Sequence, residues 1–192
     1  MADESLRAIL QVIEVLEDLG ARYHVGGSFA SSIHGLPRQT RDLDLVVELS
    51  PQQVQSFASR LERDFYLDAE RIRQAIARRS HFNLIHLGTG FKIDLFLRGT
   101  GAFDFSEFER SAPQRLTDDP PREVIVKSPE DTLLRKLHWY RLGGETSDRQ
   151  WNDVLGIART QGQRLDLEYL RQWAEVLEVA DLLESALGAG SD

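Results

Sequence analysis

Three aspartates stand in stretches that otherwise have the apolar character of strands. Asp42 and Asp44 lie one residue apart in DLDLVVEL, and Asp94 lies in FKIDLFLR. Because residues two apart on a strand point to the same side, Asp42 and Asp44 should project together, while Leu43 and Leu45 face the core. Burying three carboxylates without a counter-charge is costly, and oxygen-only ligands suit magnesium. The pattern predicts a divalent-metal site. The alternative is that each aspartate only caps a strand end.

A glycine pair and a serine, Gly26, Gly27 and Ser28, follow the apolar run that ends at Val25. A strand that turns directly into a helix here would leave backbone amides free at the helix N-terminus, and these amides and the helix dipole suit a phosphate. Glycines let a phosphate approach the backbone. Ser28 either caps the helix or binds phosphate. The spacing matches neither the Rossmann fingerprint nor the P-loop, so both are disfavoured.

The sequence also contains a basic cluster in ERIRQAIARRS, which consists of Arg71, Arg73, Arg78 and Arg79. It is either a solvated helix face or a phosphate contact. The net charge of −8 argues against a protein whose main task is to coat nucleic acid, although a local basic groove is compatible with it.

The composition excludes several classes of protein. The 192 residues include no cysteine, which removes disulfides, zinc–thiolate sites and thiol nucleophiles. No segment is apolar for long enough to cross a bilayer, so no membrane partner is expected. The acidic start MADESLRAIL is unlike an export signal. We therefore expect a cytoplasmic protein.

The hydrophobic pattern predicts an α+β fold with a mixed sheet flanked by helices, followed by a C-terminal helical region. We expect a core over 1–127 and a helical region over 128–192 packed on it. The linker-like segment 115–123 should lead into an edge strand. Helices are predicted at 5–20, 28–35, 51–61, 69–79, 128–143, 147–161 and 166–188, and strands at 22–25, 43–49, 81–87, 91–98 and 122–128.

These motifs together resemble the nucleotidyltransferase superfamily with the polymerase-β-like fold. The pattern of that superfamily begins with an apolar residue and Gly-Gly-Ser, continues with a spacer, here residues 29–41, and then has Asp-x-Asp in a strand and a third Asp in a later strand. In this chain it covers about residues 23–97. RQTRDLDLVV is similar to the R-x-T-x-D-x-D form of AbiEii-like minimal nucleotidyltransferases, many of which are toxins of toxin–antitoxin pairs. SPEDTLLRKLHWYRLGGE and SDRQWNDVLGI are similar to the C-terminal part of the same proteins.

The resemblance implies roles for these residues. Asp42 and Asp44 would bind two Mg²⁺ ions, with Mn²⁺ as the alternative ion, and Asp94 would share one metal and help to deprotonate the attacking hydroxyl. Lys136 would join the catalytic site, although a helix lysine is by default solvated. The implied nucleotide- and phosphate-binding residues are Gly26, Gly27, Ser28, Arg38, Thr40 and Asp153.

Two of these residues have simpler explanations. Arg38 either contacts a phosphate or forms a salt bridge within its loop, and Asp153 either joins the site or pairs with Arg149. The implied activity is transfer of a nucleoside monophosphate from a nucleoside triphosphate such as ATP to a hydroxyl of tRNA or of a protein, with release of pyrophosphate. A cognate antitoxin is the implied partner. The alternative is a non-catalytic module of the same fold that binds a nucleotide or a partner.

Overall fold

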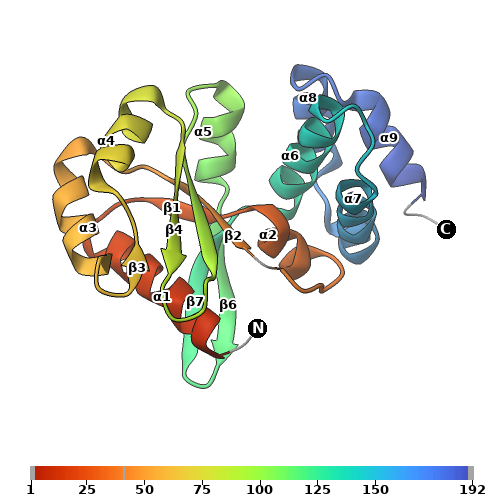
Figure 1. Ribbon diagram of the computed structural model, residues 1–192. Coiled ribbons are helices and arrows are strands. Elements are labelled where there is room, and N and C mark those ends of the chain that lie inside the picture. Colours follow the sequence, from red (N-terminus) through yellow and green to blue (C-terminus); the bar gives the residue numbers. More distant parts are fainter. Residues whose placement is uncertain (1–2, 41, 190–192) are drawn as a thin grey trace. The chain divides into compact units, whose positions relative to one another are not determined.

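The computed structural model of the chain describes residues 3–40 and 42–189. The chain forms two compact units, and each consists of two segments. One unit contains Met1–Val25 and Gln39–Val126, and the other contains Gly26–Arg38 and Lys127–Asp192. Gly26–Arg38 therefore groups with the C-terminal helices (Figure 1). The predicted division into domains at residue 127 stays a prediction.

The first unit is built on a mixed sheet. Its strands are β1 (Tyr23–Val25), β2 (Asp42–Val47), β3 (Phe65–Tyr66), β4 (His81–His86), β5 (Lys92–Leu97), β6 (Ala112–Asp118) and β7 (Pro121–Val126). Within the described residues they form a single sheet in the order β3-β4-β5-β2-β1-β7-β6. β2 runs parallel to β5 and β1 parallel to β7, whereas the other neighbouring pairs are antiparallel. The α+β fold with a mixed sheet is confirmed.

One face of this sheet forms the core of the first unit. The helices of the unit are α1 (Asp3–Asp18), α3 (Val54–Leu61), α4 (Ala69–Arg78) and α5 (Ala102–Glu109), with a 3₁₀ turn η1 at Pro51–Gln53. Alternate residues of β2, Leu43, Leu45 and Val47, are fully buried on this face. The edge-to-face contact of Phe57 on α3 with Phe82 on β4 places α3 over it. Apolar burial is the main force that fixes which side of each strand faces inward.

The second unit consists of helices. They are α2 (Gly27–His34), α6 (Pro129–Leu142), α7 (Asp148–Gln161), α8 (Leu167–Val176) and α9 (Ala180–Ala189), with a 3₁₀ turn η2 at Gly162–Arg164. α2 packs against both α6 and α7. Leu133, Leu134, Leu137, Val154 and Ile157 are fully buried among these helices. None of the helices in residues 3–40 and 42–189 has the length and apolar character of a membrane span.

Three local predictions were wrong. α2 begins at Gly27 with Gly26 as its N-cap, so Ser28 is inside the helix and does not cap it. The stretch expected to be helical throughout 166–188 is interrupted between α8 and α9, where Glu178 adopts a left-handed φ of 57°. The segment 115–123 does not lead into an edge strand, because β7 lies between β1 and β6, and the polar strand β6 is the edge. A polar edge strand is a common protection against pairing with other chains.

Candidate functional site: a carboxylate face and a cationic cluster

The predicted aspartates share one face of the sheet in the first unit. Along β2, residues alternate between partly exposed and buried, and Asp42 and Asp44 occupy the partly exposed positions. The same alternation holds along β5, where Lys92 and Asp94 are partly exposed and Ile93 is buried. Leucine and valine therefore hold these two strands in the core, and the aspartates project from the opposite side.

The register of β2 and β5 brings the carboxylates together. In this parallel pair Asp44 lies opposite Asp94, and Asp42 lies opposite Lys92. Neighbouring strands are about 4.8 Å apart, so Asp44 and Asp94 are cross-strand neighbours, and Asp42 projects from the same side of the sheet. We call Asp42, Asp44 and Asp94 the carboxylate face.

A cation already lies against the carboxylate face. The Nζ atom of Lys92 is 2.6 Å from Oδ2 of Asp94, whose side chain is 13% exposed. The hydrogen bond to Asp94, and then the charges of Asp94, Asp42 and Asp44, raise the pKa of Lys92. All three carboxylates therefore act electrostatically on one ammonium group, which here occupies a place that a metal ion could take.

The residues of the carboxylate face fit a magnesium ion by their chemistry. They are oxygen donors on rigid strands, and they attract a cation. No three His, Cys, Asp or Glu side chains in residues 3–40 and 42–189 are gathered closely enough to form a ready metal site. A metal bound there would require the three carboxylates to come closer together and Lys92 to leave Asp94, and the half-exposed side chain of Lys92 allows the second movement.

The second group of predicted residues lies in the second unit, at the start of α2. Gly27 has a left-handed φ of 54°, a conformation that suits glycine, and no side chain caps the helix N-terminus. Ser28 is buried, and its Oγ accepts hydrogen bonds from Nη2 of Arg38 at 2.6 Å and from Nη2 of Arg149 at 3.0 Å. Two guanidinium groups thus converge on the first turn of α2.

Arg38 and Lys136 are held by one buried carboxylate. Asp153 accepts hydrogen bonds from Nε and Nη2 of Arg38 at 2.7 and 2.8 Å and from Nζ of Lys136 at 2.8 Å. The Asp153 side chain is only 6% exposed. The two hydrogen bonds from Nε and Nη2 to Asp153 fix the guanidinium group of Arg38, because a two-point contact has more directional preference than a single ion pair. We call Arg38, Lys136 and Arg149 with Ser28 and Asp153 the cationic cluster.

The protonation of Asp153 follows from these contacts. Burial by itself would raise its pKa, but the hydrogen bonds from Arg38 and Lys136 outweigh burial, and the pKa of Asp153 lies below its ordinary value. The cationic cluster therefore holds three cations and one carboxylate, which leaves an excess of positive charge beside the amides at the start of α2. Such an arrangement suits an anion with several oxygens.

Arg149 was missed as a site residue. It was considered only as a partner for Asp153, whereas the structure directs its guanidinium to Ser28. The signal was present in the sequence, because residues four apart on a helix share a face, and Arg149 precedes Asp153 by four positions on α7. Once Asp153 is placed in the site, Arg149 follows from this spacing.

The remaining predicted residues have simpler positions. Gly26 is the N-cap of α2. Thr40 lies in the segment that precedes β2 and is partly exposed. Its predicted contact with a nucleotide stays a prediction, as do the roles of all the predicted site residues. What the structure brings together is the carboxylate face in the first unit and the cationic cluster in the second.

Comparisons with known proteins give no relative at the level of sequence. No family model matches the chain. No curated protein matches it either.

Solved structures do match. A nucleotidyltransferase-like protein from Paracoccidioides brasiliensis matches with a TM-score of 0.55 and 18% identity, over 98% of this chain and 94% of that one. The solution structure of the antibiotic-resistance factor ANT(2'')-Ia matches with a TM-score of 0.56 and 12% identity, over 97% of this chain and 95% of that one. Its crystal structure with adenylyl-2''-tobramycin matches with a TM-score of 0.54 and 12% identity, over 90% of this chain and 98% of that one. At these identities the likeness shows the fold, and the chain has the nucleotidyltransferase fold.

Proposed function

We propose that the chain is a nucleotidyltransferase that moves a nucleoside monophosphate from a nucleoside triphosphate to a hydroxyl of a macromolecule. The observation that carries the proposal is the alignment of Asp42, Asp44 and Asp94 on one face, with Asp44 directly opposite Asp94. The fold supports it, since the similar structures include a nucleotidyltransferase-like protein and ANT(2'')-Ia in complex with adenylyl-2''-tobramycin.

The carboxylate face takes the metal-binding role in this proposal. Asp42 and Asp44 would hold two Mg²⁺ ions, or Mn²⁺, and Asp94 would share one of them. The ions would supply charge neutralisation at the reacting phosphate. Asp94 would also accept the proton of the attacking hydroxyl. The hydroxyl oxygen forms a bond to the α-phosphorus, the bond from that phosphorus to the bridging oxygen breaks, and pyrophosphate leaves.

The cationic cluster takes the phosphate-binding role. Arg38, Arg149 and Lys136 would contact the β- and γ-phosphates together with Ser28 and the amides at the start of α2, including those of Gly26 and Gly27. Asp153 acts through the cations, because its two oxygens accept from Arg38 and Lys136. Thr40 is assigned to nucleotide contact by the resemblance alone.

The acceptor and the biological role are finer proposals. The AbiEii-like resemblance favours tRNA or a protein as acceptor, a toxin role and a cognate antitoxin. The second candidate is a non-catalytic module that binds a nucleotide or a partner. The ion pair of Lys92 with Asp94 favours this second candidate, because it occupies one of the carboxylates that catalysis requires.

Turnover separates the two candidates. Purified protein is incubated with Mg²⁺ and each radiolabelled nucleoside triphosphate, with bulk tRNA or total protein as acceptor, and label transfer and pyrophosphate are measured. Asp44→Asn should abolish both signals, whereas Asp118→Asn, which changes an exposed aspartate at the β6–β7 turn, should retain them. Nucleotide binding without pyrophosphate release would support the non-catalytic module. Equal turnover by wild type and Asp44→Asn would refute the proposed site.

A further inference from the structure

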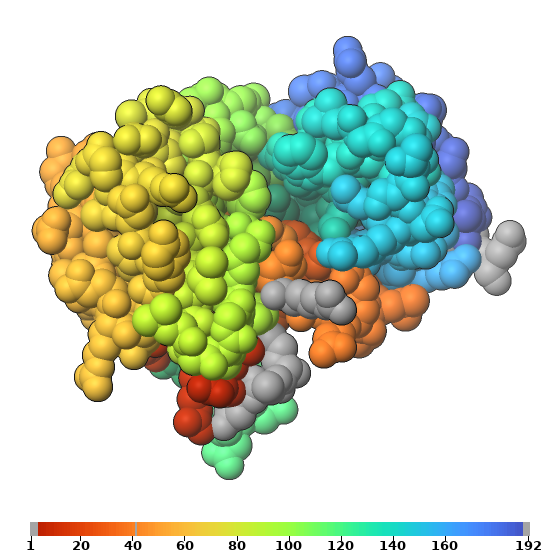
Figure 2. Space-filling model, in the orientation of Figure 1, coloured from red at the N-terminus to blue at the C-terminus, as the bar shows by residue number. Residues whose placement is uncertain are grey.

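Two aromatic side chains lie next to the cationic cluster in the second unit. Tyr140 on α6 and Trp151 on α7 contact each other across the two helices, with ring centroids 5.4 Å apart and ring planes 31° from parallel. Both residues are partly exposed. We call them the aromatic pair. Figure 2 shows the cyan segment that ends α6 and begins α7 at the surface, so a small ligand can reach this part of the second unit.

The spacing along α6 places the aromatic pair beside the cationic cluster. Lys136 and Tyr140 are four residues apart, so their side chains share one face of α6 and are separated by about 6 Å along its axis. Lys136 contacts Asp153 on α7. Tyr140 contacts Trp151, two residues earlier on α7. The aromatic pair therefore continues, by one helical turn, the side of α6 that contributes to the cationic cluster.

Together these two groups have the chemistry of a nucleotide site. The cationic cluster suits the oxygens of a triphosphate, and an aromatic ring offers a flat face on which a base can stack. In a nucleotide the ribose links the base to the phosphates, so the two groups must lie a short distance apart, as Lys136 and Tyr140 do. Leu137, which lies between them in the sequence, is fully buried, whereas the aromatic pair keeps a surface on which a ligand can pack.

We propose that the aromatic pair is the base-binding part of a nucleotide site, in which the base of a nucleoside triphosphate stacks on the exposed side of Tyr140 and Trp151. This inference rests on the proposed function, because it takes the cationic cluster as the triphosphate site. It adds a contact that phosphate groups alone do not provide, and with it a preference for nucleotides over sugar phosphates. The alternative is that Tyr140 and Trp151 only pack α6 against α7.

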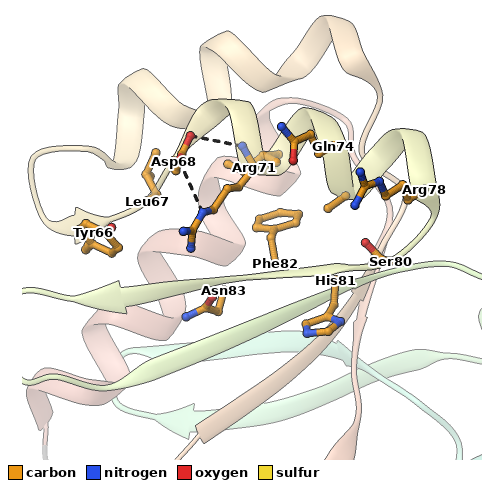
Figure 3. Close-up of a pocket in the computed structure, with 12 residues that line it drawn as sticks. Tyr66, Leu67, Asp68, Arg71, Gln74, Arg78, Ser80, His81, Phe82 and Asn83 are labelled. Atoms are coloured by element: carbon orange, nitrogen blue, oxygen red, sulfur yellow. Dashed lines mark hydrogen bonds and ion pairs between the residues drawn. The ribbon is translucent and has the colours of Figure 1, made fainter.

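A pocket in the first unit is a competing place for a base. It lies between α4 and β4, has a volume of about 330 Å³, and is lined in part by Tyr66, which is 60% exposed (Figure 3). Arg71, which also lines this pocket, is already paired with Asp68 on the same lining, at 3.7 Å. The cationic cluster, in contrast, has three cations around one carboxylate. A triphosphate is therefore favoured beside the aromatic pair.

The first experiment compares two ligands that differ only in the base. ATP and ribose 5-triphosphate are titrated into the wild-type protein by calorimetry, with Mg²⁺ and without an acceptor. ATP should bind about tenfold more tightly, since stacking on an aromatic side chain contributes about that much. Equal affinities for the two ligands would overturn the proposal, whatever the variants do.

Substitutions of the aromatic pair separate stacking from packing. Tyr140→Leu and Trp151→Leu should each weaken ATP binding about tenfold and leave the affinity for ribose 5-triphosphate unchanged. Tyr140→Phe keeps the ring and should keep the wild-type affinity for ATP. Equal losses for both ligands would mean that the aromatic pair only positions the helices, and unchanged ATP binding in both leucine variants would mean that it does not contact the base. Either result would overturn the proposal.

Trp139→Leu and Tyr66→Leu are the matched controls. Trp139 precedes Tyr140 on α6 and is 54% exposed, but its ring contacts His138. Tyr66 represents the pocket of the first unit. Both control variants should bind ATP as the wild type does. A loss in Trp139→Leu as large as in Tyr140→Leu would mean a general effect of removing an aromatic residue from α6, and a loss confined to Tyr66→Leu would move the base to the first unit. Both outcomes contradict the proposal.

Tryptophan fluorescence gives a readout that leaves the aromatic pair intact. The chain has three tryptophans, Trp139, Trp151 and Trp173, so the double variant Trp139→Phe/Trp173→Phe retains Trp151 alone. ATP should quench the fluorescence of this protein, because a base would stack on the indole ring, whereas ribose 5-triphosphate should not. Equal quenching by the two ligands would contradict stacking on Trp151.

The two proposals fail in different ways. ATP binding that depends on the aromatic pair, without label transfer or pyrophosphate release, would refute the transferase and leave a nucleotide-binding site. Label transfer that depends on Asp44 but is unaffected in Tyr140→Leu and Trp151→Leu would refute the base-binding site and leave the transferase.

Discussion

Arg38 and Asp153 are joined by a two-point ion pair, with Nε–Oδ1 at 2.7 Å and Nη2–Oδ2 at 2.8 Å. The pair connects the end of the segment 26–38 to α7, within the second unit. Because Nη2 of Arg38 also donates to Ser28, one guanidinium ties a buried carboxylate to the first turn of α2. The positions of the proposed phosphate-binding groups therefore depend on Asp153.

Replacing Asp153 by asparagine should destabilise the protein by about 3 kcal/mol, since Arg38 and Lys136 would lose their shared counter-charge at a largely buried position. Urea unfolding at pH 7 measures this. Asp148→Asn, an exposed change on the same helix, should cost less than about 1 kcal/mol.

The pKa of Asp153 is lowered from 3.8 in the folded state, so its contribution to stability is present above about pH 4 and lost as the pH falls through the lowered pKa. An unchanged difference between wild type and variant at pH 3 would contradict this assignment.

His34 should make stability fall on mild acidification. Burial lowers the pKa of His34 from 6.5, and its Nε2 lies 2.6 Å from the carbonyl oxygen of Lys127. The unfolded chain therefore binds a proton at a higher pH than the folded one, and stability decreases from about pH 7 down to the lowered pKa, by at most about 1.4 kcal/mol per pH unit. His34→Gln should flatten the profile of unfolding free energy between pH 7.5 and 5.5. His81→Gln, which replaces a histidine at an exposed site, is the matched control substitution.

Arg149→Ala should weaken triphosphate binding about tenfold, because a charge-assisted hydrogen bond to a phosphate would be lost. Titration calorimetry with a non-hydrolysable triphosphate tests this. Arg159 lies on the same helix, and its Nη2 donates to the carbonyl of Ala189. The variant Arg159→Ala should therefore bind the triphosphate with wild-type affinity. Equal affinities for all three proteins would exclude Arg149 from the phosphate site.

Lys92→Gln should strengthen Mn²⁺ binding about fivefold, since Lys92 is a half-exposed cation that competes for Asp94. Electron paramagnetic resonance of free Mn²⁺ gives the affinity directly. Lys136→Gln, which removes a lysine from the cationic cluster, serves as the comparison and should leave Mn²⁺ affinity unchanged. Weaker Mn²⁺ binding in Lys92→Gln would mean that the ammonium group supports the carboxylates instead of competing for them.

Gly35→Ala should destabilise the second unit by about 2 kcal/mol. An added Cβ would lie 2.8 Å from the backbone nitrogen of Ile157 and 2.9 Å from the carbonyl carbon of Gly156, and backbone atoms cannot yield easily. Gly188→Ala on α9 meets nothing within 4 Å and should instead stabilise by a few tenths of a kcal/mol to about 1 kcal/mol. Thermal unfolding of both variants measures the difference, and similar melting temperatures would contradict the close approach of α2 to α7.

The sequence was most informative where hydrophobic alternation and charge occur together. In β2 and β5 the buried leucines fix which side faces inward, so the common side of Asp42, Asp44 and Asp94 could be predicted. The strands predicted at 81–87 and 91–98 are present as β4 and β5, and they form an antiparallel pair.

Short or atypical elements could not be predicted in this way. β3 contains only Phe65–Tyr66, too few residues for a period to show. α5 has phenylalanines on several sides, and its clearest start signal is the carboxylate of Asp104, which accepts the amide of Gly101. The break before α9 depends on one left-handed residue, Glu178, that is neither glycine nor asparagine. Pairing of Lys92 with Asp94 and of Arg38 with Asp153 depends on side-chain positions that spacing alone leaves open.

The assignment of Gly26–Arg38 to the second unit has a consequence for how the chain can be divided. No single cut separates the two units, because α2 is encoded between β1 and β2 while its packing partners α6 and α7 are encoded about a hundred residues later. A fragment that ends near residue 127 would expose the buried side of α2, including Phe29 and Ala30, and would be prone to aggregate. To give each unit all of its own segments, the chain would have to be circularly permuted, or the fragments would have to be co-expressed.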